Sequence, residues 1–444
     1  MSISQAVLRG FAAALLCVPP LASQALPSRG IDLSLTQYRL KNGLQVILSE
    51  DDTLPVVSVV VAYGAGPVRE KPGLSGLAYL MESLMFQGSE NVSPMQHINY
   101  IQRIGGEFNA NTAFDKTYFY ETVPSNQLAL ALWLESDRMA APAVSGPAVE
   151  RAKEALIAEL RQRRTSEPYM ESFFLFDGLL YPDFAYGHPV IGTEEDLKRI
   201  TEEDARAFAS AYYVPNNAVL CIAGSFSVDK ARELVSRYFE TIPRGPDVPA
   251  PPPPSPAPPA REQVLTDSLA PSPALHVGYR LDRQQEGDAY GLKLMDILLA
   301  RGKSSRLYKR LVRKDRVAVY LSGGIEDRGG RPSLRIFAIS PNAVMADLCR
   351  KAIAGEIGKF RTAFVSETEL AKAKVLFKTD YLGRLATSLP RALLYCELTL
   401  SGARLEDIPE EFERYLRVTP VSIISLANRL FKPENASGLD LRTK

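Results

Sequence analysis

Three residues of one predicted helix have the spacing of a catalytic metal site, but two of them lack the side chains that bind metal. Residues 79 to 83 read Tyr-Leu-Met-Glu-Ser. In an H-x-x-E-H helix, two histidines four residues apart hold Zn²⁺, and the glutamate before the second histidine acts as general base. Here Tyr79 and Ser83 take the histidine positions, and Glu82 takes that of the base. The neighbouring apolar residues also fit an ordinary amphipathic core helix, which is the alternative interpretation.

Two downstream motifs weaken that alternative. Residues 105–112 read Gly-Gly-Glu-Phe-Asn-Ala-Asn-Thr, and a helical run that begins at Glu150-Arg151 carries Glu159, 76 positions after Ser83. Together with the helix, this order of motifs resembles the insulinase/pitrilysin family of inverzincin metallopeptidases across residues 36–240. The resemblance implies that Glu159 corresponds to the third zinc ligand of that family.

A candidate peptide-binding edge lies between these motifs. An extended peptide can add to the edge of a sheet through main-chain hydrogen bonds, which tolerate many sequences. The predicted edge consists of Gly106, Glu107, Phe108, Asn109, Ala110 and Asn111.

The second half of the chain carries a further motif. The run Ser304-Ser305-Arg306-Leu307-Tyr308 is followed by Arg313 and, seven residues later, by Tyr320. It resembles the family's second-half motif, in which an arginine and a tyrosine with this spacing reach toward the substrate. A guanidinium can fix a peptide carbonyl or carboxylate, and a phenol can donate to the oxyanion that forms as water attacks. The alternative is a surface arginine in an ion pair and a tyrosine in a strand.

The metal half of the site is therefore degenerate, whereas the second-half pair is retained. Neither a phenol nor an aliphatic hydroxyl is a usual ligand of Zn²⁺, and without the metal no activated water forms for Glu82 to deprotonate. None of the three histidines lies three or four residues from Glu82: His97, His188 and His276. We therefore expect no metal in this chain and only vestigial metal positions at Tyr79, Ser83 and Glu159.

The N-terminus has the features of a secretory signal peptide. Residues 1–25 carry one charge, Arg9, before a short apolar run and a small-residue stretch that ends at Ala25. We expect cleavage near Ala25 and a periplasmic or secreted mature chain. Loss of Arg9 takes the formal net charge from +1 to 0, which favours neither nucleic acid nor an anionic membrane surface as a partner. No later segment is long and apolar enough to span a bilayer.

Three cysteines remain after this cleavage. Cys221 lies in an apolar run typical of a buried strand, and Cys349 and Cys396 lie on predicted helices. The latter two could pair in an oxidising compartment, and the sequence leaves open whether they do.

A proline-rich segment divides the chain. The prolines between residues 251 and 259 exclude a helix or an interior strand and predict a stiff linker. The predicted organisation is a signal peptide at 1–25, an N-terminal domain at 26–242, the linker at 243–260 and a C-terminal domain at 261–444. A capped helix, a proline and a strand recur at an offset of 218 residues, in 201–218 and 419–436, so we expect an internal duplication.

Hydrophobic periodicity predicts an α+β fold in both halves. The expected strands are a hairpin at 38–48 with its turn at Asn42-Gly43, then 56–63, 117–123, 274–280, 317–325 and 333–339. The expected helices are 74–86, 126–139, 149–164, 228–239, 289–300, 305–312, 344–360 and 367–385. The family resemblance implies two related halves, each an antiparallel sheet covered by helices, that face one another like a clamshell.

The resemblance also implies a function. Some family members work as two-chain assemblies, in which one chain carries H-x-x-E-H with zinc and the other carries the Arg/Tyr pair. This chain looks like the second kind, a non-catalytic subunit that is inactive alone, binds peptides and supplies Arg313 and Tyr320 to a zinc-bearing partner. Two alternatives stay open: a self-contained peptide-binding or scaffold protein without a role in proteolysis, and a peptidase with an unusual metal site.

Overall fold

The computed structural model describes residues 35–251, 256–281, 285 and 287–444. The predicted signal peptide and residues 252–255 of the predicted linker lie outside the described residues. The other linker residues, 243–251 and 256–260, form neither helix nor strand, as their prolines predict.

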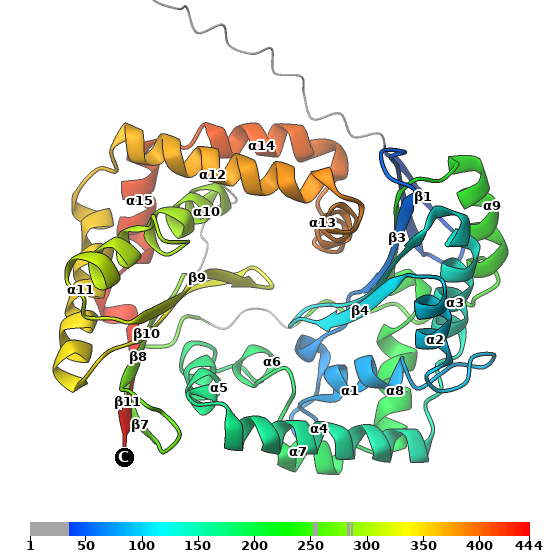
Figure 1. Ribbon diagram of the computed structural model, residues 1–444, viewed down its shortest axis with the longest axis horizontal. Helices are drawn as coiled ribbons and strands as arrows, with labels where there is room; N and C mark the ends of the chain where they lie inside the picture. Colours follow the sequence, from blue (N-terminus) through cyan, green and yellow to red (C-terminus); the bar gives the residue numbers. More distant parts are fainter. Residues whose placement is uncertain (1–34, 252–255, 282–284, 286) are drawn as a thin grey trace, which may run out of the picture. The chain divides into compact units, whose positions relative to one another are not determined.

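The N-terminal half is built on a six-stranded sheet with the order β1-β2-β6-β3-β5-β4 (Figure 1). Its central strand, Val56–Tyr63, is rich in valine and almost entirely buried, as β-branched residues favour. The strands are β1 (Thr36–Arg39), β2 (Gln45–Glu50), β3 (Val56–Tyr63), β4 (Glu107–Thr112), β5 (Thr117–Pro124) and β6 (Ala218–Gly224).

The helices of this half are α1 (Leu77–Leu84), α2 (Gln96–Arg103), α3 (Leu128–Ala140), α4 (Gly146–Ser166), α5 (Met170–Leu180), α6 (Phe184–Gly187), α7 (Glu194–Arg199), α8 (Glu202–Tyr212) and α9 (Val228–Phe239). Short 3₁₀ turns occur at η1 (Pro67–Arg69), η2 (Ser125–Gln127) and η3 (Pro215–Asn217).

The C-terminal half is built on a five-stranded sheet with the order β7-β11-β8-β10-β9. Its strands are β7 (Glu262–Asp267), β8 (Ala274–Arg280), β9 (Tyr320–Arg328), β10 (Arg331–Ile339) and β11 (Ala436–Thr443). Its helices are α10 (Asp288–Leu299), α11 (Ala343–Thr362), α12 (Glu367–Ala386), α13 (Ser388–Leu400), α14 (Ile408–Leu416) and α15 (Pro420–Leu430), with a π-helix η4 (Tyr308–Lys314) and 3₁₀ turns η5 (Leu405–Asp407) and η6 (Pro433–Asn435).

The two sheets share one topology, which agrees with the predicted relation between the halves. In sequence order, β2 to β6 correspond to β7 to β11, with the same neighbours and the same relative directions. The repeat at an offset of 218 residues falls on matching elements, because α8 and α15 both begin with a capping box, at Thr201 and Thr419. Each is followed by a proline-initiated 3₁₀ turn and a strand.

Three expectations need correction. The sheets are mixed rather than purely antiparallel, since β2 runs parallel to β6 and β7 runs parallel to β11. These parallel pairs arise because the last strand of each half, β6 or β11, returns through intervening helices to lie beside an early strand of that half, β2 or β7. The helix expected at 305–312 becomes the π-helix η4, and the following strand starts at Tyr320 instead of residue 317.

One helix of each half packs on the sheet of the other half. α13 packs on β3 and β6, and α5 packs on β8 and β11. The contact is polar at equivalent places: Ser388 of α13 bonds Ser58 of β3 at 2.9 Å, and Ser172 of α5 bonds His276 of β8 at 2.8 Å. α5 and α13 begin at positions 170 and 388, so the exchange follows the 218-residue offset.

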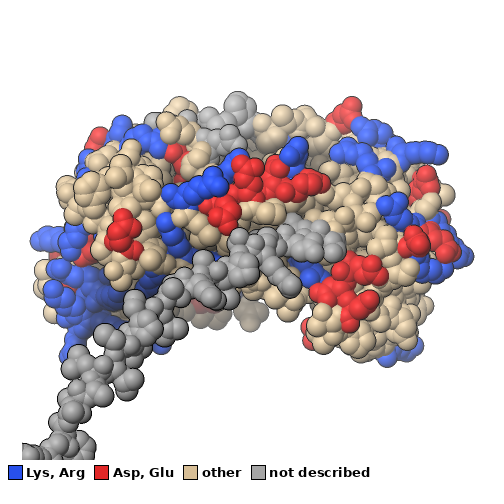
Figure 2. Space-filling model, turned by 90° about the horizontal axis from the view of Figure 1, so that it is seen from above, with Lys and Arg blue, Asp and Glu red and all other residues tan. Residues whose placement is uncertain are grey.

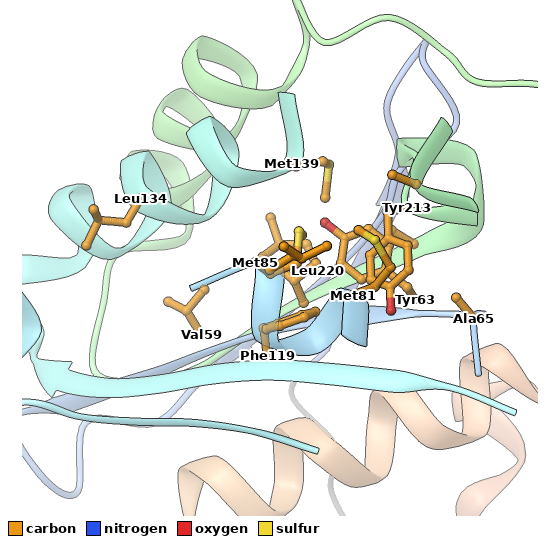
Figure 3. Packing of buried hydrophobic residues seen from close by; sticks show 14 of the residues in the cluster. Val59, Tyr63, Ala65, Met81, Met85, Phe119, Leu134, Met139, Tyr213 and Leu220 are labelled. Carbon is orange, nitrogen blue, oxygen red and sulfur yellow. The ribbon is translucent and has the colours of Figure 1, made fainter. Parts of the chain in front are cut away.

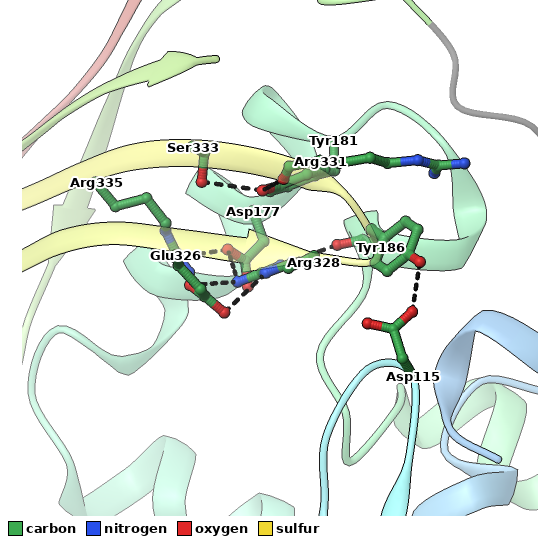
Figure 4. A network of polar contacts seen from close by, with 9 residues as sticks. All are labelled: Asp115, Asp177, Tyr181, Tyr186, Glu326, Arg328, Arg331, Ser333 and Arg335. Atoms are coloured by element: carbon green, nitrogen blue, oxygen red, sulfur yellow. Dashed lines mark hydrogen bonds and ion pairs between the residues drawn. The ribbon is translucent and has the colours of Figure 1, made fainter. Parts of the chain in front are cut away.

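A buried polar network joins α5 and α6 to the β9–β10 hairpin (Figure 4). Arg328 donates hydrogen bonds of 3.1 Å to Asp177 and to the carbonyl of Tyr186, and it also donates to Glu326. Its guanidinium lies 4.0 Å from the centre of the Phe114 ring. Because Arg328 is only 3% exposed, these partners replace the water that its charge has lost.

The three described cysteines, Cys221, Cys349 and Cys396, are buried free thiols. Cys396 lies beside Cys221, so the pairing of Cys349 with Cys396 that the sequence left open is not the one the fold brings together. On the face drawn in Figure 2, basic and acidic side chains are interspersed over much of the surface. Within the described ranges, every helix is too short or too polar to cross a membrane.

Candidate functional site

Helix α1 places one face in the core and the other beside β4 and α4. Its apolar residues pack among core side chains from the sheet and α3, as Figure 3 shows for Met81 beside Tyr63, Phe119 and Tyr213. The buried carboxylate of Glu70 accepts hydrogen bonds from the backbone N–H groups of Gly76 and Ala78, at 3.0 and 2.7 Å. Those donors would otherwise stay unsatisfied at the helix start.

The polar face of α1 carries the three residues singled out by their spacing. Tyr79, Glu82 and Ser83 are all half-buried. The Thr112 hydroxyl, at the end of β4, donates a hydrogen bond of 2.6 Å to Glu82. Burial raises the pKa of Glu82, while the bonds from Thr112 act in the opposite direction.

Glu159 of α4 joins this group, as the sequence predicted. Burial raises the pKa of Tyr79, and the neighbouring Glu159 carboxylate, which also accepts a hydrogen bond from the phenol, raises it further. Arg163, one turn later on α4, donates to the same carboxylate. Glu159 therefore forms an ion pair with a guanidinium and lies beside a phenol.

The strand β4 is an edge strand. In the part of the chain that the structure describes, it pairs with β5 and with no other strand. Phe108 and Ala110 turn toward the core, while Glu107, Asn109 and Asn111 are exposed. Gly106 precedes the strand, and a side chain there would meet Val123 at 2.9 Å, which explains the glycine.

One main-chain donor of β4 points to the free edge. The Asn109 side chain accepts a hydrogen bond of 2.8 Å from the backbone N–H of Ala110, so this N–H does not bond β5. In an antiparallel pair, outward donors recur at every second residue. The N–H of Thr112, two residues later, bonds Glu82, in agreement with that alternation.

The second-half pair is split between two elements. Arg313 lies on the π-helix η4 and is exposed, with its guanidinium 5.8 Å from the ring centre of Tyr308. Tyr320 begins the edge strand β9, is 50% exposed and contacts Phe337 edge-on. Both side chains are accessible, and Arg313 lies against Tyr308 rather than against Tyr320; their role toward a substrate stays a prediction.

A cavity of about 310 Å³ borders β9. Glycines of β9, an aromatic and histidine wall and three charged side chains line it: Gly323, Gly324, Phe173, His276, Phe337, Arg301, Glu326 and Arg335. The sequence did not indicate this cavity, because its wall combines α5 of one half with strands of the other.

Comparison with known proteins identifies the family. A sequence model of the insulinase family, peptidase family M16, matches residues 45–174, and one of the peptidase M16 inactive domain matches residues 199–376. The chain belongs to the M16 insulinase family. The zinc protease PqqE of Helicobacter pylori is 28% identical over 411 residues, which cover 91% of each chain.

Solved structures agree with this assignment. The crystal structure of a protease from Helicobacter pylori matches with a TM-score of 0.86 and 26% identity, over 92% of this chain and 99% of that one. A peptidase M16 inactive domain from Pseudomonas fluorescens matches with a TM-score of 0.84 at 16% identity, over 93% and 99% of the two chains. The second match supports the fold alone.

The residues at the family's metal position do not fit zinc in this M16 chain. A phenol and a hydroxyl replace the two imidazoles, and the remaining carboxylate is paired with Arg163. Zinc sites need three protein ligands with nitrogen, sulfur or carboxylate donors, and Glu159 is the one such ligand at these three positions. The vestigial role of Tyr79, Ser83 and Glu159 stays a prediction, which metal analysis can test.

Among the described residues, one other group brings three metal-type side chains together. His97, Glu121 and Glu135 have ligand atoms within 4.8 Å of one another, all deeply buried. Arg138 donates to Glu135 and lies over the Phe119 ring, so a guanidinium already occupies one of the two carboxyl groups. The signal for this cluster in the sequence is the pair of charges, Glu135 and Arg138, inside the apolar run of α3.

Proposed function

We propose that this M16 chain is the non-catalytic subunit of a secreted two-chain zinc peptidase. It would pair with a homologous chain that carries H-x-x-E-H and zinc, bind extended peptides and supply Arg313 and Tyr320. The observation that carries the proposal is the contrast between the two motifs. The metal position holds Tyr79, Ser83 and a Glu159 that is paired with Arg163, whereas the second-half pair is intact and exposed.

The edge of β4 supports peptide binding. An incoming strand needs free main-chain donors and acceptors at the edge. The N–H of Ala110 faces that edge and is covered by the side chain of Asn109, which an arriving peptide carbonyl can replace. A side chain as a temporary partner keeps the donor satisfied in the free protein.

The edge of β9 offers a second contact surface in the other half. Tyr320 begins that strand, and the cavity beside Gly323 and Gly324 has both aromatic and charged walls. Such a mixture suits a peptide side chain together with a terminal or backbone polar group.

The test is reconstitution. The mature chain would be mixed with an H-x-x-E-H chain of the same organism, for which a similar-length gene next to its own is the first candidate. We expect the two to co-elute and the mixture to cleave unfolded peptides that neither chain cleaves alone. Separate elution at micromolar concentration, with unchanged activity on mixing, would contradict the proposal and favour a stand-alone peptide-binding protein.

A further inference from the structure

Helix α13 is held in a defined position on the sheet of the N-terminal half. Ser388 bonds Ser58, Arg391 donates a hydrogen bond of 2.9 Å to Asp51, and Glu397 lies 3.4 Å from Lys116. These contacts follow α13 from its first turn to its last and fix both its rotation and its translation on β3 and β6.

This placement brings two thiols together. Cys221 lies in the middle of β6, paired with Val60 of β3 and Ile47 of β2. Cys396 lies on α13, which packs on β6, and its thiol neighbours that of Cys221. Both side chains are 0% exposed. Burial and the neighbouring Cys221 thiol raise the pKa of Cys396.

The third cysteine is in a different environment. Cys349 on α11 is also buried, and its thiol lies near Ser340. Burial raises its pKa to about 11, so it is a poor nucleophile in the folded chain.

We propose that Cys221 and Cys396 form a disulfide when the chain folds in an oxidising compartment, and that this bond joins β6 of the N-terminal half to α13 of the C-terminal half. Each thiol loses its proton as the S–S bond forms. The two electrons pass to an oxidised dithiol oxidoreductase or to oxidised glutathione, whose own disulfide breaks into two thiols. The bond closes a loop that contains the proline-rich segment, so it restricts the unfolded chain strongly.

The burial of both thiols determines when the bond can form. Exchange requires that the oxidant reach a sulfur, so the reaction belongs to folding, before α13 covers β6. After folding, the same burial protects the bond from reductants. The inference does not rest on the proposed peptidase role, because it depends only on the contact and on export of the chain.

The experiment counts thiols in the full chain. The protein would be exported in a bacterial host and, in a parallel arm, purified, reduced, unfolded and refolded with reduced and oxidised glutathione. Each sample would be denatured without reductant, alkylated and mapped by mass spectrometry. We expect alkylation of Cys349 alone, a cross-linked peptide pair that contains Cys221 and Cys396, and alkylation at all three positions after reduction.

Two variants and one measurement on the wild type serve as controls. Cys349→Ala should leave the cross-link unchanged, and Cys221→Ala should abolish it. Wild type that is reduced in denaturant and refolded with reductant should melt several degrees below the oxidised wild type, and the same treatment should leave the Tm of Cys221→Ala unchanged. Three free thiols in both the exported and the refolded protein, or a cross-link that involves Cys349, would overturn the proposal.

Discussion

The carboxylate of Glu82 on α1 accepts a hydrogen bond of 2.6 Å from the hydroxyl of Thr112 on the edge strand β4. The helix that would carry a zinc site is thereby tied to the strand that would carry a peptide. Because Tyr79 and Ser83 offer no imidazole, we expect the purified chain to bind no stoichiometric zinc and to cleave no peptide. Metal analysis of the purified protein, with and without chelator, measures the zinc content, and a peptidase assay measures the cleavage.

The same frame allows a gain-of-function test. The double variant Tyr79→His, Ser83→His restores two imidazoles beside Glu159, so it should take up about one zinc per chain. Adding Glu159→Gln should remove the metal again, whereas adding Glu82→Gln should not, because the base is not a ligand. Stoichiometric zinc in the wild type, or none in the double variant, would contradict the interpretation of the site.

Peptide binding at β4 can be tested through one donor. Ala110→Pro deletes the N–H that faces the free edge without removing a bond to β5. We expect it to weaken the affinity for an extended peptide by about tenfold, as loss of one hydrogen bond of roughly 1.4 kcal/mol predicts. Titration with a fluorescent peptide measures the effect.

Asn109→Ala is the matched control for that edge. It removes the side chain that covers the Ala110 N–H, so the peptide has no competitor and affinity should stay equal or rise. Equal weakening by both variants would show that the peptide does not use this edge.

The second-half pair makes a prediction about rate. If Tyr320 donates to the reacting peptide, Tyr320→Phe should lower kcat/KM of the mixed two-chain complex by about 10² to 10³ while assembly is unchanged. Phenylalanine keeps the contact with Phe337, so only the hydroxyl is lost. Tyr238→Phe on α9 serves as the control. Full activity of Tyr320→Phe would mean that the Tyr320 hydroxyl takes no part in the reaction and that the residue has a structural role only.

Local signals in the sequence predicted most elements, and long-range contacts account for what it missed. The capping threonines, prolines and strands that mark the duplication repeat within short windows, so Thr201 and Thr419 were readable. Which helix packs on which sheet depends on side chains far apart in the chain. The exchange of α5 and α13 between the halves therefore could not be predicted from the sequence. Once the 218-residue offset is known, the packing of α5 on β8 does indicate that of α13 on β3.

The candidate site shows the same division. Helical spacing predicted that Tyr79, Glu82 and Ser83 share one face, and their partners came only from the fold. The sequence did not indicate that Arg313 lies on a π-helix, with its guanidinium near the Tyr308 ring five residues earlier.

The polar network between the halves should carry much of their stability. In Arg328→Ala the buried Asp177 keeps Arg335 as its remaining guanidinium partner, so the loss should approach, without exceeding, the about 3 to 5 kcal/mol typical of removing one member of a buried ion pair. Arg206→Ala on α8 removes an exposed pair with Glu202 and should cost under about 1 kcal/mol. Urea unfolding followed by circular dichroism compares the two. Similar midpoints for both variants would mean that the network contributes little.

The cluster around Glu135 predicts a pH dependence. Burial raises the pKa of Glu135 from 4.5 to about 7, and Arg138 opposes the shift; burial likewise raises the pKa of Glu121, with which Glu135 shares a hydrogen bond. The folded chain therefore holds a proton that the unfolded chain releases above about pH 4.5. This contribution to stability is complete below that pH and is lost as the pH rises toward 7.

His97 faces the same cluster and acts in the opposite direction. Burial lowers its pKa from 6.5 to about 4, so its contribution is lost as the pH falls from 6.5. Glu135→Gln isolates the carboxyl, because glutamine resembles the protonated acid and cannot ionise. The free energy of unfolding of the wild type, minus that of Glu135→Gln, should fall by about 1 to 3 kcal/mol between pH 5 and 8. Exposed Glu154→Gln on α4 controls for the substitution itself. Parallel curves for wild type and Glu135→Gln would mean that the cluster carries no extra proton at neutral pH.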